Sequence, residues 1–430
     1  MTTSVLVMGG SHFLGRAVAA EALRRSWSVT VFNRGKTGRN PVGVRALQGG
    51  RTNQADLSHL AGLGPWDAII DTSGASADVV DRATQTLALA TSRYVYVSTV
   101  SVYAGWPLLP LTEDLPTLSE AEPMADVPSD ANVAYGLDKA DSEKAALTNL
   151  EDFLTILRPG VILGPEEYVG RLPWWLKRVE RGGRVLAPGD PDQPIAPVDA
   201  RDVATFACDR TVAAREAEVF NLTAPKNHAT MERFLRACIE VTGSDAALEW
   251  VDGGFLLDHG AKQWTELPLW RTHPGTWAVS GVRAQEAGFE CRPLSETVTD
   301  TRSWLTSGGD CRRQRAGGPS RPGRREGGRP ARCLGCSLGT DFVARGSRQG
   351  GPGGVPPEAF ELTPQLRRLA VPVQRGDREL CAHTLETGQE AVHSLLGWQL
   401  EHRAQSRYRG FQIAVQELAG REVCGAAGGT

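Results

Sequence analysis

Short apolar runs alternate with longer amphipathic stretches along the first 306 residues of the chain. Residues 4–8 are mostly apolar and include two β-branched valines, a pattern that predicts a strand buried on both faces. Residues 13–25 carry apolar side chains at helical spacing and contain no proline, which predicts an amphipathic helix. Gly9 and Gly10 stand between the two, so the chain opens with a strand, a glycine turn and a helix.

The same alternation continues to residue 305. Further strands are expected at residues 27–32, 45–48, 68–71, 94–97 and 157–163, with shorter ones within residues 185–195 and at 250–251. Further helices are expected at residues 56–63, 77–92, 133–147, 171–180, 203–214, 229–242, 280–289 and 293–305. Residues 104–132 are rich in proline and are expected to form a loop. This order predicts an α/β fold with a doubly wound parallel sheet.

The glycine turn is the first candidate site. Gly9 permits the tight turn, Gly15 permits close packing of the helix on the strand, and the helix N-terminus offers N–H groups and a positive dipole to a pyrophosphate. The alternative is an ordinary strand-to-helix turn. After the second strand the chain has Asn33 and Arg34 and no acid. This favours NADP over NAD because an arginine meets the 2′-phosphate, although Arg34 can also be a solvated surface residue.

Polar groups gather where the fourth and fifth strands end. Thr72, Ser73 and Gly74 follow the fourth strand, and Ser98 and Thr99 follow the fifth. The carboxyl ends of parallel strands meet at one edge of an open sheet, which is where such a sheet holds its ligand. We therefore expect these residues to line the same site as the glycine turn.

Tyr135 and Lys139 are four residues apart, so they lie on one face of the helix that begins near residue 133. An ammonium beside a phenol lowers the pKa of the phenol, which can then exchange a proton with a substrate hydroxyl or carbonyl. Thr99 can bind the same substrate oxygen. Taken alone, this spacing is common on surface helices. It becomes specific only behind a nucleotide-binding turn and a hydroxyl-rich strand end.

Four motifs together resemble the extended short-chain dehydrogenase/reductase family, which comprises NAD(P)-dependent epimerases, dehydratases and reductases. They are VMGGSHFLGR from Val7, VSTVSVY from Val97, YGLDKA from Tyr135 and LRPGVILGP from Leu157. The resemblance covers residues 1 to about 306 and implies a Rossmann-type domain. It also implies that Thr99 is the active-site hydroxyl, that Tyr135 is the acid/base and that Lys139 orients Tyr135 and the nicotinamide ribose.

The sequence departs from the family pattern at two places. His12 stands where most extended members have the middle glycine of the turn, so the turn resembles that of an atypical branch. Gly49, Gly50 and Arg51 stand where the family commonly has an aspartate that reaches the adenine. The complete set of residues expected around the cofactor is Gly9, Gly10, Ser11, His12, Phe13, Leu14, Gly15, Asn33, Arg34, Thr72, Ser73, Gly74, Lys139 and Pro159, with no metal.

Residues 1–165, with a contribution from residues 195–225, are predicted to form the dinucleotide-binding core, and residues 166–306 a smaller substrate domain. Arg158, Arg171 and Arg201 are candidates to bind an anionic substrate, or alternatively form surface ion pairs. Large rings are numerous in the second region and either stack on a substrate or fill a core. They are Trp174, Trp175, Trp264, Trp270 and Trp277.

The composition changes after residue 307. Residues 308–430 contain 18 arginines, no lysine and 12 acidic residues, so the remainder of the chain has a formal charge of −9 although the whole chain carries −3. The tail, residues 307–430, is rich in Arg, Gly and Pro. We interpret it as largely disordered or as the product of a coding frame shift. Its Cys333 and Cys336 suggest zinc, but no second pair follows at a zinc-site spacing.

The charge and the apolar runs of the chain argue against two classes of protein, those that bind nucleic acid through a basic surface and those that span a membrane. An acidic body speaks against a nucleic-acid footprint. The chain has no apolar run near the length of a membrane span and no basic, apolar leader, which predicts a cytoplasmic protein. Cys208, Cys238 and Cys291 are widely spaced and are expected to be reduced thiols.

The resulting hypothesis is an NAD(P)-dependent oxidoreductase or epimerase that acts on a secondary alcohol or carbonyl of a small molecule. NADP is the preferred cofactor. The sequence leaves the oligomeric state open, with a homodimer as one option because dimers are usual among the relatives. One alternative is a redox-silent dinucleotide-binding or RNA-associated atypical Rossmann protein. Another is an epimerase that keeps NAD permanently bound, which Arg34 disfavours.

Overall fold

A computed structural model describes residues 2–36, 40–74, 76–128, 132–213 and 217–309, and these residues belong to one compact unit. The predictions for the arginine-rich tail and for zinc at Cys333 and Cys336 lie outside the described residues.

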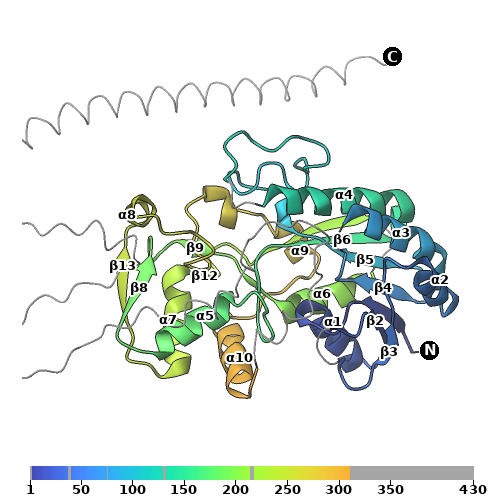
Figure 1. The fold of residues 1–430 in the computed structure, drawn as a ribbon, viewed down its shortest axis with the longest axis horizontal. Coiled ribbons are helices and arrows are strands. Elements are labelled where there is room, and N and C mark those ends of the chain that lie inside the picture. The colour runs from blue at the N-terminus through green and yellow to red at the C-terminus, as the bar shows by residue number, and fades with distance from the viewer. Residues whose placement is uncertain (1, 37–39, 75, 129–131, 214–216, 310–430) are drawn as a thin grey trace, which may run out of the picture. The chain divides into compact units, whose positions relative to one another are not determined.

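A seven-stranded parallel sheet forms the centre of the fold, and it confirms the predicted doubly wound Rossmann-type class (Figure 1). Its strand order is β11-β6-β5-β4-β1-β2-β3, which reverses direction between β1 and β4 as in dinucleotide-binding sheets. The strands are β1 (Ser4–Met8), β2 (Ser28–Asn33), β3 (Arg45–Gln48), β4 (Ala68–Asp71), β5 (Tyr94–Val97), β6 (Leu154–Pro159) and β11 (Glu218–Leu222).

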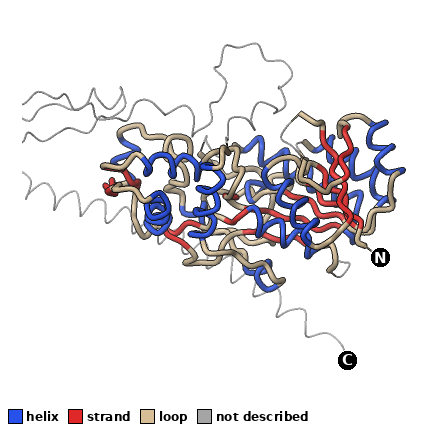
Figure 2. The backbone as a smooth tube through the Cα atoms, turned by 90° about the horizontal axis from the view of Figure 1, so that it is seen from below, coloured by secondary structure: helices blue, strands red, loops and turns tan. Residues whose placement is uncertain are grey.

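Helices cover both faces of this sheet because successive side chains of a strand point to opposite faces. Val5 and Val7 of β1 face the core beneath α1 (Phe13–Arg24) and α6 (Ala200–Arg210). Leu6 and Met8 face the opposite core, beneath α2 (Gln54–Gly62), α3 (Ala77–Leu87) and α4 (Val133–Leu150). Figure 2 shows the strands lying between the two sets of helices.

A smaller region gathers beyond one end of the sheet (Figure 1). Its core is built on α5 (Arg171–Glu180), α7 (Met231–Thr242) and α10 (Leu294–Thr306), with Trp175 and Phe234 completely buried. Three two-stranded sheets complete it: β7 (Ile162–Leu163) with β10 (Val198–Asp199), β8 (Arg184–Pro188) with β13 (Ala247–Val251), and β9 (Pro194–Ile195) with β12 (Ala229–Thr230). The short helix α8 (Gly253–Asp258) follows β13, whereas the short helix α9 (Val282–Glu286) packs on the core of the central sheet beside β11.

Several predicted boundaries are wrong, and two of them concern elements next to the candidate site. The sixth strand starts at Leu154 rather than at residue 157 and ends at Pro159, because residues 154–159 pair with β5 and β11; all six are buried, including the polar Thr155 and Arg158. The helix expected at residues 203–214 spans Ala200–Arg210, because the Asp199 carboxylate accepts a hydrogen bond from the N–H of Arg201 and caps the helix there.

Candidate active site

The glycine turn after β1 brings three backbone segments together. Gly9 and Gly10 have φ values of +111° and +82°, which favour glycine. A Cβ at Gly15 would lie 2.7 Å from the Gly10 nitrogen and 2.7 Å from Thr72 Oγ1, so only glycine lets α1 approach the turn. Thr72 in turn donates its hydroxyl to the carbonyl of Met8, which ties the end of β4 to the end of β1.

His12 and Phe13 begin α1 and face a residue from a distant loop. The His12 ring lies 4.6 Å from the ring of Tyr168, and Phe13 meets the same ring edge-on at 6.1 Å. His12 is the N-cap residue, but its side chain does not cap the helix. The first backbone N–H groups of α1 therefore have no side-chain cap from His12.

A cleft of about 940 Å³ runs along the carboxyl edge of the sheet, next to this turn. Ligand pockets usually occupy about 300–1,000 Å³. Every residue predicted around the cofactor lines this cleft, from Gly9 to Gly15 in the turn, through Asn33, Arg34, Thr72, Ser73 and Gly74, to Lys139 and Pro159. Thr99 and Tyr135 line the same cleft, so the fold gathers both predicted sets in one place.

Thr99 and Lys139 are held by short polar contacts. Thr99 follows β5 and accepts a hydrogen bond from the N–H of Ser101, 3.2 Å away. The Lys139 ammonium donates to Tyr96 Oη at 2.6 Å, to the Val97 carbonyl at 2.8 Å and to the Gly74 carbonyl at 3.3 Å. Burial lowers the pKa of Lys139 to about 8.

The expected lowering of the Tyr135 pKa by Lys139 is wrong for this structure. Tyr135 is 45% exposed and lines the cleft. Desolvation there raises the pKa of its phenol, with a further contribution from Tyr168, whereas Thr99 and Arg171 act in the opposite direction. Lys139 is not among the named causes of this shift, and its ammonium is bound to Tyr96 and two carbonyl groups. Tyr135 therefore keeps its proton at neutral pH.

Arg51 is a site residue whose contacts no sequence motif reveals. Its guanidinium makes two 2.8 Å contacts with the carboxylate of Asp71 and also donates to Ser73 Oγ at 2.9 Å. Asp71 has no exposed surface and also accepts the Tyr94 hydroxyl at 2.9 Å. Desolvation acts to raise the Asp71 pKa, but Arg51 and these hydrogen bonds hold the net pKa below its ordinary value. Arg51 lines the cleft together with Gly49 and Gly50, the stretch in which the sequence departs from the family pattern.

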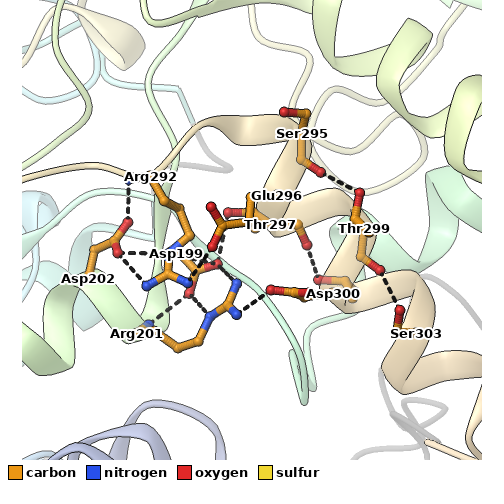
Figure 3. A network of polar contacts seen from close by, with 11 residues as sticks. Asp199, Arg201, Asp202, Arg292, Ser295, Glu296, Thr297, Thr299, Asp300 and Ser303 are labelled. Atoms are coloured by element: carbon orange, nitrogen blue, oxygen red, sulfur yellow. Dashed lines mark hydrogen bonds and ion pairs between the residues drawn. The ribbon is translucent and has the colours of Figure 1, made fainter.

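Two of the three arginines proposed for an anionic substrate are engaged elsewhere. Arg158 is buried and makes a two-point ion pair with Glu143, at 3.0 and 2.6 Å. Figure 3 shows Arg201 directed toward Asp199 and Asp300, the first contact being 2.7 Å. Neither residue lines the cleft, whereas Arg171 does.

Some of the tryptophans are buried in the smaller region, whereas others line the cleft. Trp175 and Trp270 are buried in the smaller region, where the Trp175 indole donates to the Pro268 carbonyl at 2.7 Å. Trp264 and Trp277 line the cleft, together with Trp106, which the sequence analysis did not single out.

The three cysteines of the body are free thiols, as expected, and burial raises the pKa of Cys208 and Cys291 to about 12. In the parts of the chain that the structure describes, no group of histidine, cysteine, aspartate and glutamate residues is arranged to hold a metal ion. None of the described helices is long and apolar enough to cross a membrane.

Known proteins resemble this chain in sequence and in fold. Residues 5–222 match the model of the NAD dependent epimerase/dehydratase family. The Bordetella bronchiseptica enzyme WbmH in complex with NAD+ is 16% identical with a TM-score of 0.55, over 71% of this chain and 99% of that chain. A UDP-glucose 4-epimerase is 16% identical with a TM-score of 0.54, over 71% and 98%. At these identities the likeness shows the fold.

A further relative is the chloroplast stem-loop binding protein of 41 kDa b from Arabidopsis thaliana. It is 24% identical over 260 residues, which cover 56% of this chain. The chain spans 63% of that protein's length, which is less than two thirds.

Proposed function

Because the chain belongs to the NAD dependent epimerase/dehydratase family, we propose that it is an NADP-linked oxidoreductase or epimerase acting on a secondary alcohol or carbonyl of a small molecule. The observation that carries this proposal is the single cleft that holds the glycine turn together with Thr99, Tyr135 and Lys139. Residues 1–165 and 195–225 would bind the cofactor, and residues 166–306 the substrate.

The residues of the turn fit a dinucleotide. Gly9 and Gly10 have positive φ values, and the lack of a Cβ at Gly15 lets α1 pack closely against the turn. The backbone N–H groups at the start of α1 could therefore bind a pyrophosphate. Arg34 is exposed, lies in the wall of the cleft and would meet a 2′-phosphate. A bound nicotinamide would supply or accept a hydride at the substrate carbon.

Tyr135 would move the proton. Since its raised pKa keeps the phenol protonated at neutral pH, Tyr135 would donate that proton to a substrate carbonyl oxygen as the carbon becomes a secondary alcohol. Thr99 would hold the same oxygen by a hydrogen bond. Lys139, fixed by Tyr96 and two carbonyl groups, would orient the cofactor ribose.

The test is a fluorescence titration of the full chain with NADPH and NADH. Wild type is expected to bind NADPH more tightly, and Arg34→Ala is expected to weaken NADPH by about tenfold while leaving NADH nearly unchanged, as loss of one charged contact predicts. Tyr135→Phe should bind NADPH normally but lose turnover in a screen of carbonyl substrates. If neither nucleotide binds, the enzyme proposal is wrong.

A second candidate function is binding of structured RNA without redox chemistry. It is favoured by one observation, the 24% identity to a protein named for stem-loop binding. The formal charge of −9 outside residues 308–430 speaks against it. A gel-shift assay with a stem-loop RNA, repeated with excess NADPH, separates the two candidates, because RNA bound in the cleft would be displaced by the nucleotide.

A further inference from the structure

The guanidinium of Arg51 has two forks of N–H groups, and the protein uses one of them. Nη1 and Nη2 donate to Asp71 Oδ1 and Oδ2, both at 2.8 Å, and Nη1 also donates to Ser73 Oγ at 2.9 Å. A guanidinium carries five N–H donors in a planar arrangement, so two remain, on Nε and on Nη2. Nε has no hydrogen-bond partner among the described residues. These two N–H groups lie side by side and form a second fork, which a pair of acceptors can meet.

Arg51 lies in the part of the cleft where the base of a dinucleotide would bind. Its side chain is 13% exposed and lines the cleft. Thr99 follows β5 on one side of the glycine turn, whereas Arg34 and Arg51 come after β2 and β3 on the other side. A dinucleotide with its pyrophosphate at the turn and its nicotinamide near Thr99 therefore has its base toward Arg51.

The carboxylates around Arg51 are occupied by protein groups. Asp71 also accepts the Tyr94 hydroxyl at 2.9 Å and the Ser73 N–H at 3.0 Å. Asp56 accepts the N–H of Gly50 at 2.8 Å. Neither carboxylate lines the cleft, and its described lining contains no other aspartate or glutamate. A base in this part of the cleft therefore meets the donors of Arg51 rather than a carboxylate acceptor.

Purine bases differ in what they present to such a fork. A 6-oxo purine carries two neighbouring acceptors, O6 and N7, and arginine binds this pair bidentately. Adenine has N7 as well, but its 6-position carries an amino donor in place of O6. The carbonyls of Gly50 and Thr52, which could accept from that amino group, already accept from the Asn53 N–H and from Arg82. The groups around Arg51 therefore match a 6-oxo purine better than adenine.

We propose that the cleft binds a nicotinamide dinucleotide with a 6-oxo purine base, such as hypoxanthine, in preference to one with adenine, and that Nε and Nη2 of Arg51 donate to O6 and N7. The inference rests on the proposed function, because it concerns the base of the cofactor that the same cleft would hold. It names Arg51 as the residue that selects the base, whereas Arg34 keeps its separate role at the 2′-phosphate.

The experiment titrates the full chain with four nucleotides and follows the fluorescence of the reduced nicotinamide that all four share. They are NADPH, NADH and the two analogues in which hypoxanthine replaces adenine. Each hypoxanthine nucleotide is expected to bind about fivefold more tightly than its adenine counterpart, as the discrimination of a bidentate arginine contact predicts. Both members of a pair have the same ribose and phosphate groups, so the ratio of their dissociation constants reports on the base alone.

Matched variants locate the effect. Arg51→Lys keeps a cation beside Asp71 but removes the fork, so the preference for hypoxanthine should disappear. Arg82→Lys is the control, because Arg82 donates to the Thr52 carbonyl at 2.8 Å, in the same loop, and does not line the cleft. It should keep the wild-type ratio.

A change to the ligand tests the same contact without any variant. The hypoxanthine nucleotide in which carbon replaces N7 keeps O6 but offers the fork only one acceptor. Its affinity for the wild type is expected to fall by about fivefold. This measurement decides the question even where Arg51→Lys does not fold.

Three results would overturn the inference while NADPH still binds. They are hypoxanthine nucleotides that bind no more tightly than adenine nucleotides, a preference for hypoxanthine that folded Arg51→Lys retains, and an N7-to-carbon analogue that binds as tightly as its parent. Failure of all four nucleotides to bind the wild type would instead contradict the proposed function, and this inference with it.

Discussion

Asp71 is a carboxylate with no exposed surface, and it stays ionised because Arg51 meets both of its oxygens. Removing one partner of a buried ion pair leaves an uncompensated charge. We expect Arg51→Ala to lower the free energy of unfolding by about 3–5 kcal/mol at pH 7, measured by urea denaturation.

The control for this prediction is Arg24→Ala, which removes an ion pair with Glu21 from the surface. Water screens that pair, so little or no change is expected. Equal effects of the two substitutions would show that the Arg51 pair is also solvated.

Lys139 makes the stability of the fold depend on pH in a defined direction. Its pKa is about 8 in the folded protein, below the ordinary value of 10.5, so the unfolded chain binds more protons between these two values. The contribution of Lys139 to the free energy of unfolding therefore rises as pH increases from about 8 to 10.5, by a quantity on the order of 3 kcal/mol.

Lys139→Met removes this titration. The difference in unfolding free energy, variant minus wild type, is expected to fall across the same pH range, as measured by urea denaturation at several pH values. Thiols and phenols that do not contact Lys139 titrate alike in both proteins and cancel in the difference, whereas Tyr96, which accepts a hydrogen bond from Lys139, does not. A difference that does not change with pH would mean that Lys139 has its ordinary pKa.

At the scale of elements, α4 is placed by one glycine. A Cβ at Gly136 would lie 2.2 Å from the carbonyl oxygen of Ser101, so α4 can approach the turn after β5 only with glycine there. Tyr135 precedes this contact directly and Lys139 follows it by about one turn, so the contact sets how closely the part of α4 that carries both residues approaches the turn after β5. We expect Gly136→Ala to destabilise the protein by about 1–3 kcal/mol, as overpacking does.

Gly62→Ala is the matched control in thermal or urea unfolding. Gly62 is the last residue of α2, and an added Cβ there meets no atom within 4 Å. The same substitution should therefore stabilise the protein by about 0.4–1 kcal/mol. Destabilisation by both substitutions would point to a general intolerance of alanine rather than to the contact with Ser101.

Local pattern predicts the limits of several strands, buried and exposed alike. The observed limits of β3, β4 and β5 are those expected from their sequences. The sixth strand begins three residues before its predicted start, at Leu154, and it contains the charged residue Arg158. Arg158 is buried only because Glu143, from α4, and the Tyr103 hydroxyl meet its guanidinium.

At the scale of the whole molecule, the predicted site residues come together because parallel strands end at a common edge, which sequence order reveals. Arg51, Trp106 and Arg271 could not be predicted in this way. Each reaches the cleft from a loop whose path is set by contacts distant in sequence, such as the stacking of Arg271 on Trp106. Motif spacing therefore identifies the cofactor side of the cleft, whereas the substrate side depends on tertiary packing.

The distribution of charge over the molecule gives the last prediction. Residues outside 308–430 carry a formal charge of −9, yet the described lining of the cleft contains no carboxylate, so the attraction for an anion is local to the cleft. Salt shortens the Debye length from about 10 Å at 0.1 M to about 3 Å at 1 M.

We expect the dissociation constant for NADPH to rise several-fold over this range, and that for NADH, which lacks the 2′-phosphate, to rise less. Arg34→Ala should make the two nucleotides equally sensitive in a fluorescence titration, because it removes the cation that distinguishes them. Equal sensitivity already in the wild type would mean that Arg34 does not meet the 2′-phosphate, and the preference for NADP would have to be abandoned.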